Sequence, residues 1–344
     1  MAGSFIQRNW FLLGILAAIA LGMLLPEIGA GLNPGSRTST AIVVALFVIT
    51  GLTLPAETIW RGLRNIRLHL YLQVFIFCIV PLYFLATLTL TRSLIPESLR
   101  VGVFALACLP TTVSSCVIFA QMAGGNAVGA LFNSTLANIA GIFLSPLILS
   151  FMLQNGLGVL PKGETIRILK DLALTIFLPF IAGQGARFLF AKAFISRRRS
   201  LFAILSNALI LLIIFFAFCK SARNELLHDK APQLLVPFLY LAVSHLILTA
   251  AAYGGARVLR LNGVDTIAVV FVAPQKTIAM GLPLLTTYFA NDPQMLALAI
   301  VPLLFYHPWQ LLVAGFLRSA PFIRKAGAVS IDAGEAQSRQ TGAR

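Results

Sequence analysis

The sequence predicts an all-α polytopic membrane protein, and two features lead to that fold class. Of its 344 residues, 58% are hydrophobic and 11% are charged, whereas about 25% of residues are charged in an average soluble protein. The apolar residues also fall in long runs instead of the amphipathic stripes of a soluble core. Each run is expected to be a helix, because a helix satisfies its own backbone hydrogen bonds within lipid.

Ten apolar runs are candidate membrane spans, since about 20 residues of helix cross the hydrocarbon layer. The predicted helices cover residues 10–25, 38–54, 68–90, 101–122, 127–153, 168–188, 201–219, 234–259, 266–289 and 295–317. The connecting loops are short, so residues 1–317 are expected to form a single integral membrane domain. Residues 318–344 are rich in Gly, Ala, Ser and Gln and are predicted to be a disordered cytoplasmic tail.

The net charge of +15 reflects 26 Lys and Arg residues, almost all of which lie between the apolar runs. The two termini and every second loop carry 16 of them, the other loops carry 9, and the last is Lys276 within a run. This bias predicts that both termini are cytoplasmic, in what we expect to be a bacterial inner membrane. No basic stripe with interleaved aromatic residues occurs, so the expected partner is the lipid bilayer and not a nucleic acid.

Ten helices divide into two halves of five, residues 10–153 and 168–317, and an odd number per half forces opposite orientations in the membrane. The fourth helix is interrupted at Pro110 and the ninth at Pro274, 164 residues later. Each interruption is followed by a short polar turn and another long apolar run. Two inverted repeats with paired broken helices are typical of secondary transporters, which bind their substrates at such breaks.

Polar side chains gather around both interruptions and on the fifth helix. Proline frees backbone carbonyl and amide groups, and at membrane depth these groups need protein, water or ligand partners. The candidate binding residues are Thr112, Ser114, Ser115, Gln275, Lys276 and Thr277 at the breaks, and Ser134 and Asn138 on the fifth helix. The alternative is two simple proline kinks whose hydroxyls bond back to the preceding turn.

Lys276 is the only strongly charged residue well inside a predicted helix. An ammonium at mid-membrane costs about 3 kcal/mol or more, so this side chain is expected to face the interior of the bundle. No Asp or Glu lies in the central part of any predicted helix, and the counter-charge is therefore expected to be a substrate anion or helix-end carbonyls. The alternative is that Lys276 extends to the membrane surface.

Gln73, His245, His307 and Gln310 are further polar residues within predicted helices. Each is expected to be a packing residue whose polar atoms are satisfied, and His307 is the strongest candidate for another role. The four cysteines lie within apolar runs and indicate neither a disulfide framework nor a zinc site.

The sequence gives little support to an enzymatic function. Metalloprotease, nucleotide-binding and Asp-rich motifs do not occur. A Ser–Lys dyad of Ser114 or Ser115 with Lys276 is chemically reasonable, but nothing in the sequence positions it. We therefore expect no enzymatic activity and no cofactor, with coupling to Na⁺ or H⁺ left open.

Several motifs resemble the SBF-like branch of the bile acid:sodium symporter superfamily. They are CLPTTVSS at 108–115, MAGGN at 122–126, FLSPL at 143–147, RLHL at 67–70, Lys276 with GLP at 281–283, and LLFYH at 303–307. The resemblance implies a panel domain of helices 1, 2, 6 and 7 and a core domain of helices 3–5 and 8–10. It also implies that the broken helices 4 and 9 cross at the centre.

In sodium-coupled members of this superfamily, polar groups on helices 3, 4, 5 and 9 hold the ions, together with a glutamate in helix 9. The residues at the matching positions are Ser114, Ser115, Ser134, Asn138, Gln73, Gln275 and Thr277. The glutamate should fall near Val272 or Ala273, where this chain has no carboxylate, and Lys276 lies close by. The resemblance therefore suggests that the ammonium of Lys276 replaces a sodium ion.

The function we predict is secondary transport of a small anionic organic solute by alternating access between panel and core. One alternative is a sodium-coupled organic-anion symporter that holds Na⁺ with neutral oxygens of Ser114, Ser115, Ser134 and Gln275. Another is a membrane regulator or scaffold that transports nothing. The identity of the solute, the coupling ion, the direction of transport and the oligomeric state do not follow from the sequence.

Overall fold

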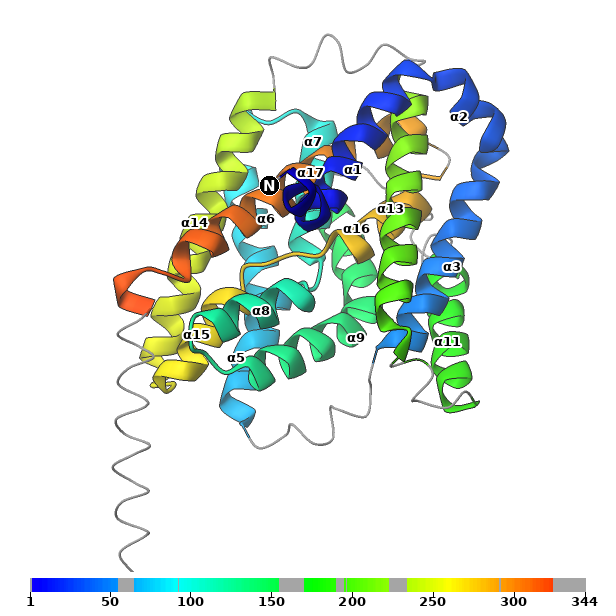
Figure 1. Ribbon diagram of the computed structural model, residues 1–344. Coiled ribbons are helices and arrows are strands. Elements are labelled where there is room, and N and C mark those ends of the chain that lie inside the picture. The colour runs from blue at the N-terminus through cyan, green and yellow to red at the C-terminus, as the bar shows by residue number, and fades with distance from the viewer. Residues whose placement is uncertain are drawn as a thin grey trace, which may run out of the picture.

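The structure is a computed structural model of the 344 residues. It describes residues 2–54, 65–91, 93–154, 170–189, 195, 197–222, 234–290 and 292–323. Within these ranges the regular elements are helices, and no strand occurs (Figure 1). The predicted all-α class is confirmed for this part of the chain.

The helices follow the ten apolar runs. Their bounds are α1 (Ala2–Leu24), α2 (Pro26–Leu32), α3 (Arg37–Thr53), α5 (Ile66–Val74), η2 (Phe75–Ile79), α6 (Val80–Leu90), α7 (Glu97–Cys108), α8 (Ser114–Met122), α9 (Ala127–Met152), η4 (Ala173–Phe177), α11 (Leu178–Leu189), α13 (Arg199–Ala222), α14 (Leu235–Val258), α15 (Gly263–Val272), α16 (Ile278–Tyr288) and α17 (Pro293–Leu317). The predicted tail starts after α17, and its positions from 324 onward lie outside the described residues.

The prediction of ten spanning helices is confirmed only in part. Seven helices of the described chain are long and apolar enough to cross a membrane, and an eighth span is counted if a bent pair is included. That pair comprises residues 13–24 and α2, which meet at an angle of 96° beside Pro26. The fourth and ninth runs each form two short helices, because a proline interrupts both.

The two interruptions have matching positions in the chain. Leu109 precedes Pro110 and is extended, with ψ 149°, which is the conformation that a following proline favours. The helix α15 ends 164 residues after α7, and α16 begins 164 residues after α8. Each break therefore separates its two half-helices by the same number of residues.

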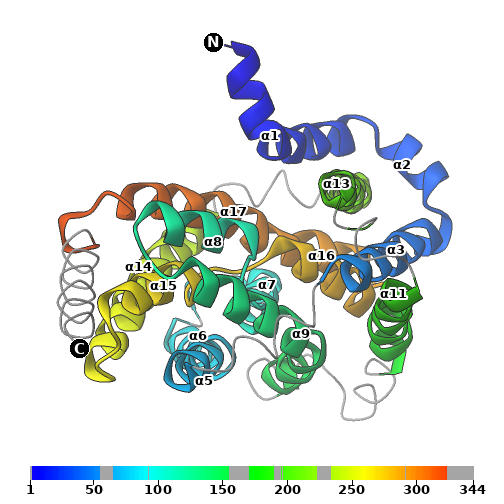
Figure 2. The ribbon, with the colours of Figure 1, turned by 60° about the horizontal axis from the view of Figure 1, so that its bottom comes forward.

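The helices form two groups, and in Figure 2 one of them, with α1, α2, α3, α11 and α13, lies along one side of the other. We call α1, α2, α3, α11 and α13 the panel helices, because α13 packs against α1, α2 and α3 while α3 packs along α11. We call α5 to α9 and α14 to α17 the core helices. Gly51 and Gly183 allow α3 and α11 to approach closely, since a Cβ at either would lie 2.3 Å from a carbonyl oxygen of the other helix.

The panel contacts the core mainly where α3 and α13 meet α16 and α17. At this end the Ser36 hydroxyl donates to the carbonyl of Ala290 at 3.3 Å. Ser36 and Gly35 both have positive φ, 63° and 55°, and Ser36 therefore holds a backbone conformation that is uncommon outside glycine. The side chain of Asn33 bonds both the hydroxyl and the backbone N–H of Ser39, which fixes the turn that carries Ser36.

At the opposite end of the core, one carboxylate joins three helix starts. Asp265 is buried in the first turn of α15 and accepts hydrogen bonds from the amide of Asn65 at 2.6 Å and of Asn126 at 2.7 Å. These asparagines also cap α5 and α9 through their Oδ1 atoms, and Asn262 caps α15 in the same way. The carboxylate thus lies among helix N-termini, where the helix dipoles favour a negative charge.

Candidate functional site

The two breaks touch each other directly. The backbone N–H of Thr277, at the end of the second break, donates to the carbonyl of Pro110 in the first at 3.0 Å. The two breaks that were expected to meet at the centre are therefore in contact in the structure. Thr277 also begins α16, because its hydroxyl accepts from the N–H of Ala279.

Five consecutive carbonyl oxygens, at the end of α7 and in the first break, each have a donor from another part of the core. The donors are Lys276 Nζ to Ala107, Ser145 Oγ to Cys108, Lys276 Nζ to Leu109, Thr277 N to Pro110, and Asn138 Nδ2 to Thr111. A proline kink whose hydroxyls merely bond back to their own helix would leave these acceptors without such partners. The first break is therefore held by hydrogen bonds from α9 and from the second break.

The ammonium of Lys276 has three carbonyl acceptors, which we call the carbonyl site. Its Nζ atom donates to Leu109 at 2.7 Å, to Ala107 at 3.0 Å and to Ile76 at 3.3 Å. A lysine ammonium has three donors, so all of them are used. The side chain is only 2% exposed, which rules out extension to the membrane surface. Backbone carbonyls, one of the two counter-charges expected from the sequence, therefore surround the ammonium.

The carbonyl of Ile76 is free for Lys276 because of a local change in helix register. Residues 75–79 form a π-helical turn, in which the N–H of Val80 bonds Phe75 and not Ile76. In that register the partner of Ile76 would be the residue five positions on, which is Pro81 and has no N–H. Pro81 is the only trace of this acceptor in the sequence, and it becomes informative only once the π-helical register is known.

The second break is held by α17. The Tyr306 hydroxyl donates to the carbonyl of Pro274 at 2.8 Å and lies 2.9 Å from His245 Nδ1. Gln310 bonds both the N–H and the carbonyl of Lys276 and lies 3.1 Å from His307 Nδ1. His245, His307 and Gln310 were expected to be packing residues, and the structure brings them to the break together with Tyr306, for which no role was expected.

Gln275 is the centre of a group of hydroxyl and thiol donors, which we call the hydroxyl cluster. Its Oε1 atom accepts from Thr112 at 2.8 Å, from Ser115 at 3.1 Å and from Cys116 at 3.7 Å. The hydroxyls of Thr112 and Ser115 also contact each other. Ser114, which the sequence placed with them, is exposed at the first residue of α8.

The predicted residues of the third and fifth helices lie beside this cluster but differ in their bonding. The Asn138 amide donates to the carbonyls of Thr111 and Ser134, and Gln73 donates to Asn133. The Oγ atom of Ser134 is buried and has no hydrogen-bond partner, as is also true of the Thr135 hydroxyl and of Gln73 Oε1.

These residues offer a sodium ion neutral oxygens only. Gln275, Ser115 and the unpartnered Ser134 hydroxyl are suitable oxygen ligands for a hard cation. No group of three or more His, Cys, Asp or Glu that could bind a metal occurs in the described ranges, and the three acceptors of the carbonyl site already bond Lys276. A sodium site on these residues would therefore be weaker than one that includes a carboxylate.

A cavity of about 160 Å³ separates the panel from the core beside the hydroxyl cluster. It is lined by Thr53, Leu54, Phe202, Ala203 and Ser206 of the panel and by Val113, Leu131 and Thr135 of the core. Val113 precedes α8, and no side chain caps that helix, so the first N–H groups of α8 have no partner within the helix. The cavity is thus next to a helix N-terminus and to the unpartnered Thr135 hydroxyl.

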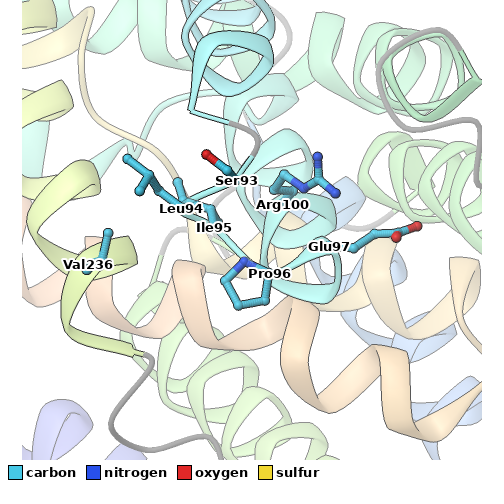
Figure 3. Close-up of a pocket in the computed structure, with 7 residues that line it drawn as sticks. All are labelled: Ser93, Leu94, Ile95, Pro96, Glu97, Arg100 and Val236. Carbon is cyan, nitrogen blue, oxygen red and sulfur yellow. The ribbon is translucent and has the colours of Figure 1, made fainter.

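A larger cavity of about 460 Å³ lies elsewhere, at the turn between α6 and α7 and the start of α14 (Figure 3). Ser93, Glu97, Arg100 and Val236 are among its lining residues. None of the predicted site residues lines this cavity, and its size alone does not make it the functional site.

Comparison with known proteins agrees with the sequence motifs. A family model described as the SBF-like CPA transporter family matches residues 9–323. The chain is 32% identical to sodium/bile acid cotransporter 7 of Mus musculus over 90% of its own length and 92% of the relative's length. It is also 32% identical to the protein of that name from Xenopus tropicalis, over 91% of each chain.

A bacterial relative is similar over almost the same range. An uncharacterized protein of Pseudomonas aeruginosa is 28% identical over 89% of this chain and 91% of its own. The apolar helices and these relatives identify an integral membrane protein, and the predicted resemblance is confirmed. The chain belongs to the SBF-like CPA transporter family, a family of membrane transporters and not of enzymes.

Proposed function

We propose that the protein is a secondary transporter of a small anionic organic solute, in which Lys276 takes the place of a coupling cation. The observation that carries this proposal is the position of the ammonium, bonded to three carbonyls where the two broken helices cross. In broken-helix transporters, unwound carbonyls at this depth coordinate the coupling ion. Here the same chemistry is satisfied by a cation that is covalently part of the chain.

The positive charge of Lys276 stabilises the crossing in the way a bound ion would. Carbonyl dipoles from α7, its following break and η2 converge on one ammonium, and no carboxylate of the described chain contributes. A tethered cation does not dissociate during a transport cycle. We therefore expect solute movement without a requirement for sodium.

The solute is expected to bind in the 160 Å³ cavity between panel and core and not on Lys276. The three donors of the ammonium are already used, whereas no side chain caps the amino end of α8 and the buried Thr135 hydroxyl has no hydrogen-bond partner. Helix N-termini attract anions through free N–H groups and the helix dipole. Thr53 and Ser206 add hydroxyls from the panel side of the cavity.

Alternating access is supported by the one-sided contact between panel and core. The Ser36 and Ala290 end is joined by a hydrogen bond, while the Thr53 end, at the other terminus of α3, borders the cavity. The equal offset of the two breaks supports an arrangement of two inverted five-helix repeats, with both termini on the cytoplasmic side. In that orientation the cavity faces the cytoplasm.

The vertebrate relatives are named sodium/bile acid cotransporters, which supports an organic solute. A sodium-coupled symporter is the second candidate function, and the specific observation in its favour is the buried Ser134 hydroxyl without a partner. Sodium bound there would add an oxygen ligand to Ser115 and Gln275.

The test is uptake into proteoliposomes by the purified full chain. Small carboxylates are first screened for those that raise its thermal stability, since a ligand that binds only the folded form stabilises it. Uptake of such a carboxylate is then measured with a sodium gradient, a proton gradient or neither, in wild type and in Lys276→Met. Lys170→Met, at an exposed lysine, is the matched control.

Each result favours one function. Uptake that needs no sodium and is lost in Lys276→Met supports the proposal. Strict dependence on sodium would favour the symporter. Stabilisation without uptake of any carboxylate would favour the non-transporting regulator or scaffold.

A further inference from the structure

Gln310 makes an unusual contact with the lysine of the crossing. Its side chain is fully buried on α17, its Oε1 atom accepts from the backbone N–H of Lys276 at 2.8 Å, and its Nε2 atom donates to the carbonyl of the same residue at 2.8 Å. The two bonds pair one side-chain amide with both polar groups of one residue, as a neighbouring strand would.

Only a side-chain amide can form this pair. Lys276 lies between α15 and α16, so its N–H and carbonyl have no place in the hydrogen bonds of either helix, and at this depth water does not replace them. Glutamine supplies one acceptor and two donors on a single group. A carboxylate in its place would lack the donor, and an apolar side chain would lack both.

We propose that Gln310 is a positioning residue, which fixes the main chain of Lys276 so that the ammonium stays on its three carbonyls. The inference deepens the proposed function and rests on it for its role in transport. A lysine side chain is flexible. Its ammonium contacts the carbonyls of Ile76, Ala107 and Leu109 together only if the backbone of Lys276 is held in one position. Gln310 supplies that point from a helix that carries none of the three acceptors.

Neighbouring residues hold the amide of Gln310 in this orientation. Nε2 also lies 3.1 Å from His307 Nδ1, one turn earlier on α17, and the imidazole tautomer with its proton on Nε2 accepts a hydrogen bond there. Four residues before Gln310, Tyr306 donates to the carbonyl of Pro274. One face of α17 therefore holds two residues of the second break.

The experiment measures how fast an amine-reactive acylating reagent modifies Lys276 in the purified full chain, read by peptide mass spectrometry. Gln310→Met keeps the volume and removes both bonds. Gln310→Glu keeps the acceptor for the Lys276 N–H and loses the donor to its carbonyl. Gln184→Met is the matched control, because Gln184 bonds a backbone carbonyl of Leu54 in the panel, far from Lys276 in the chain.

Wild type and Gln184→Met should react slowly at Lys276. The rate should rise about tenfold or more in Gln310→Met, as expected for the loss of two buried hydrogen bonds, and to an intermediate level in Gln310→Glu. The thiol of Cys219 is buried on the panel helix α13, and its rate of modification by a thiol reagent reports general unfolding. That rate should stay at the wild-type value in both Gln310 variants. If Gln310→Met does not fold, Gln310→Glu decides the question by the same measurement.

A Lys276 rate equal to that of wild type in a folded Gln310 variant would overturn the inference. A rise matched by Cys219 would also overturn it, since it would indicate a general structural role. The readout does not involve transport. If wild type transports nothing while the Gln310 variants react faster at Lys276 and not at Cys219, the proposed function is rejected. The positioning role of Gln310 is then still supported.

Discussion

Removal of the Lys276 side chain tests whether its ammonium fills a cation site. Lys276→Ala leaves the carbonyls of Ile76, Ala107 and Leu109 without their donor, and each buried acceptor without a partner costs about 1–3 kcal/mol. The three together amount to about 3–9 kcal/mol, against which the loss of a charge at mid-membrane returns about 3 kcal/mol. The net expectation is a loss of about 0–6 kcal/mol in stability, with a central value of about 3 kcal/mol.

A small external cation should restore part of this loss. Propylammonium matches the lysine side chain beyond Cβ and can donate to the same three carbonyls. At a concentration of 100 times its Kd, a ligand of the folded form adds about 2.7 kcal/mol. Sodium should act in the same direction through the carbonyl oxygens, whereas choline has no N–H donor and is too bulky for the site.

The assay is thermal unfolding of the purified protein at constant ionic strength, with propylammonium, sodium or choline chloride. Lys276→Ala should have a lower midpoint than wild type, and its midpoint should rise with propylammonium and not with choline. Wild type should respond to neither, because its site is filled. The reasoning is refuted if the variant is as stable as wild type and insensitive to every cation, or if wild type responds equally.

Four further perturbations test other parts of the structure. Cysteines at Ser36 and Ala290 should form a cross-link that stops uptake and is reversed by a reducing agent, and uptake that continues in the cross-linked protein would reject closure at this end. Asp265→Leu should lower the midpoint of thermal unfolding by several degrees, because two amides lose a charged acceptor, while Asp265→Asn should lose less. Thr135→Val, which keeps the shape of the side chain, should weaken stabilisation by a carboxylate with little change in the unliganded midpoint. Gly51→Val should destabilise the panel, since its Cβ would lie 2.3 Å from a carbonyl of α11, and an unchanged midpoint would contradict that packing.

Much of the fold could be predicted from the sequence because lipid imposes simple rules. Long apolar runs become helices, and a proline inside a run ends one helix before the next begins, as at Pro110 and Pro274. The burial of Lys276 could be predicted for the same reason, since its run extends on both sides. The count of spans was less predictable, because the bend beside Pro26 and the two breaks depend on how helices pack.

The partners of Lys276 were not predictable from periodicity. The Ile76 carbonyl is available only because η2 changes the helix register before Pro81, and a hydropathy pattern does not record such a change. Gln310 is 34 residues from Lys276 in the chain, and no helical spacing links them across the loop. Ser114 and Ser115 are adjacent at the start of α8, yet only Ser115 faces Gln275, because helical phase cannot be extrapolated through a break.

A tethered cation changes the charge balance of transport. In a sodium-coupled carrier, the positive charge of each ion moves with the solute and offsets the charge of an anion. Lys276 stays in the protein, so a complete cycle moves only the charge of the solute. Transport of a monovalent anion is therefore expected to be electrogenic, and a potential of 100 mV acts on it with about 2.3 kcal/mol.

This expectation also gives a direction, because a negative cell interior drives a monovalent anion outward. At 100 mV the equilibrium ratio is about fiftyfold, so export needs no coupling ion and uptake needs another source of energy. The measurement is carboxylate uptake into proteoliposomes with potassium diffusion potentials set by valinomycin, in the absence of sodium. An inside-positive potential should accelerate uptake and an inside-negative one should slow it. At either potential, the uptake rate should saturate as the carboxylate concentration is raised. Uptake that is unaffected by potential, or accelerated by an inside-negative potential, would mean that a mobile cation accompanies the solute, and the role of Lys276 as a fixed replacement would have to be abandoned.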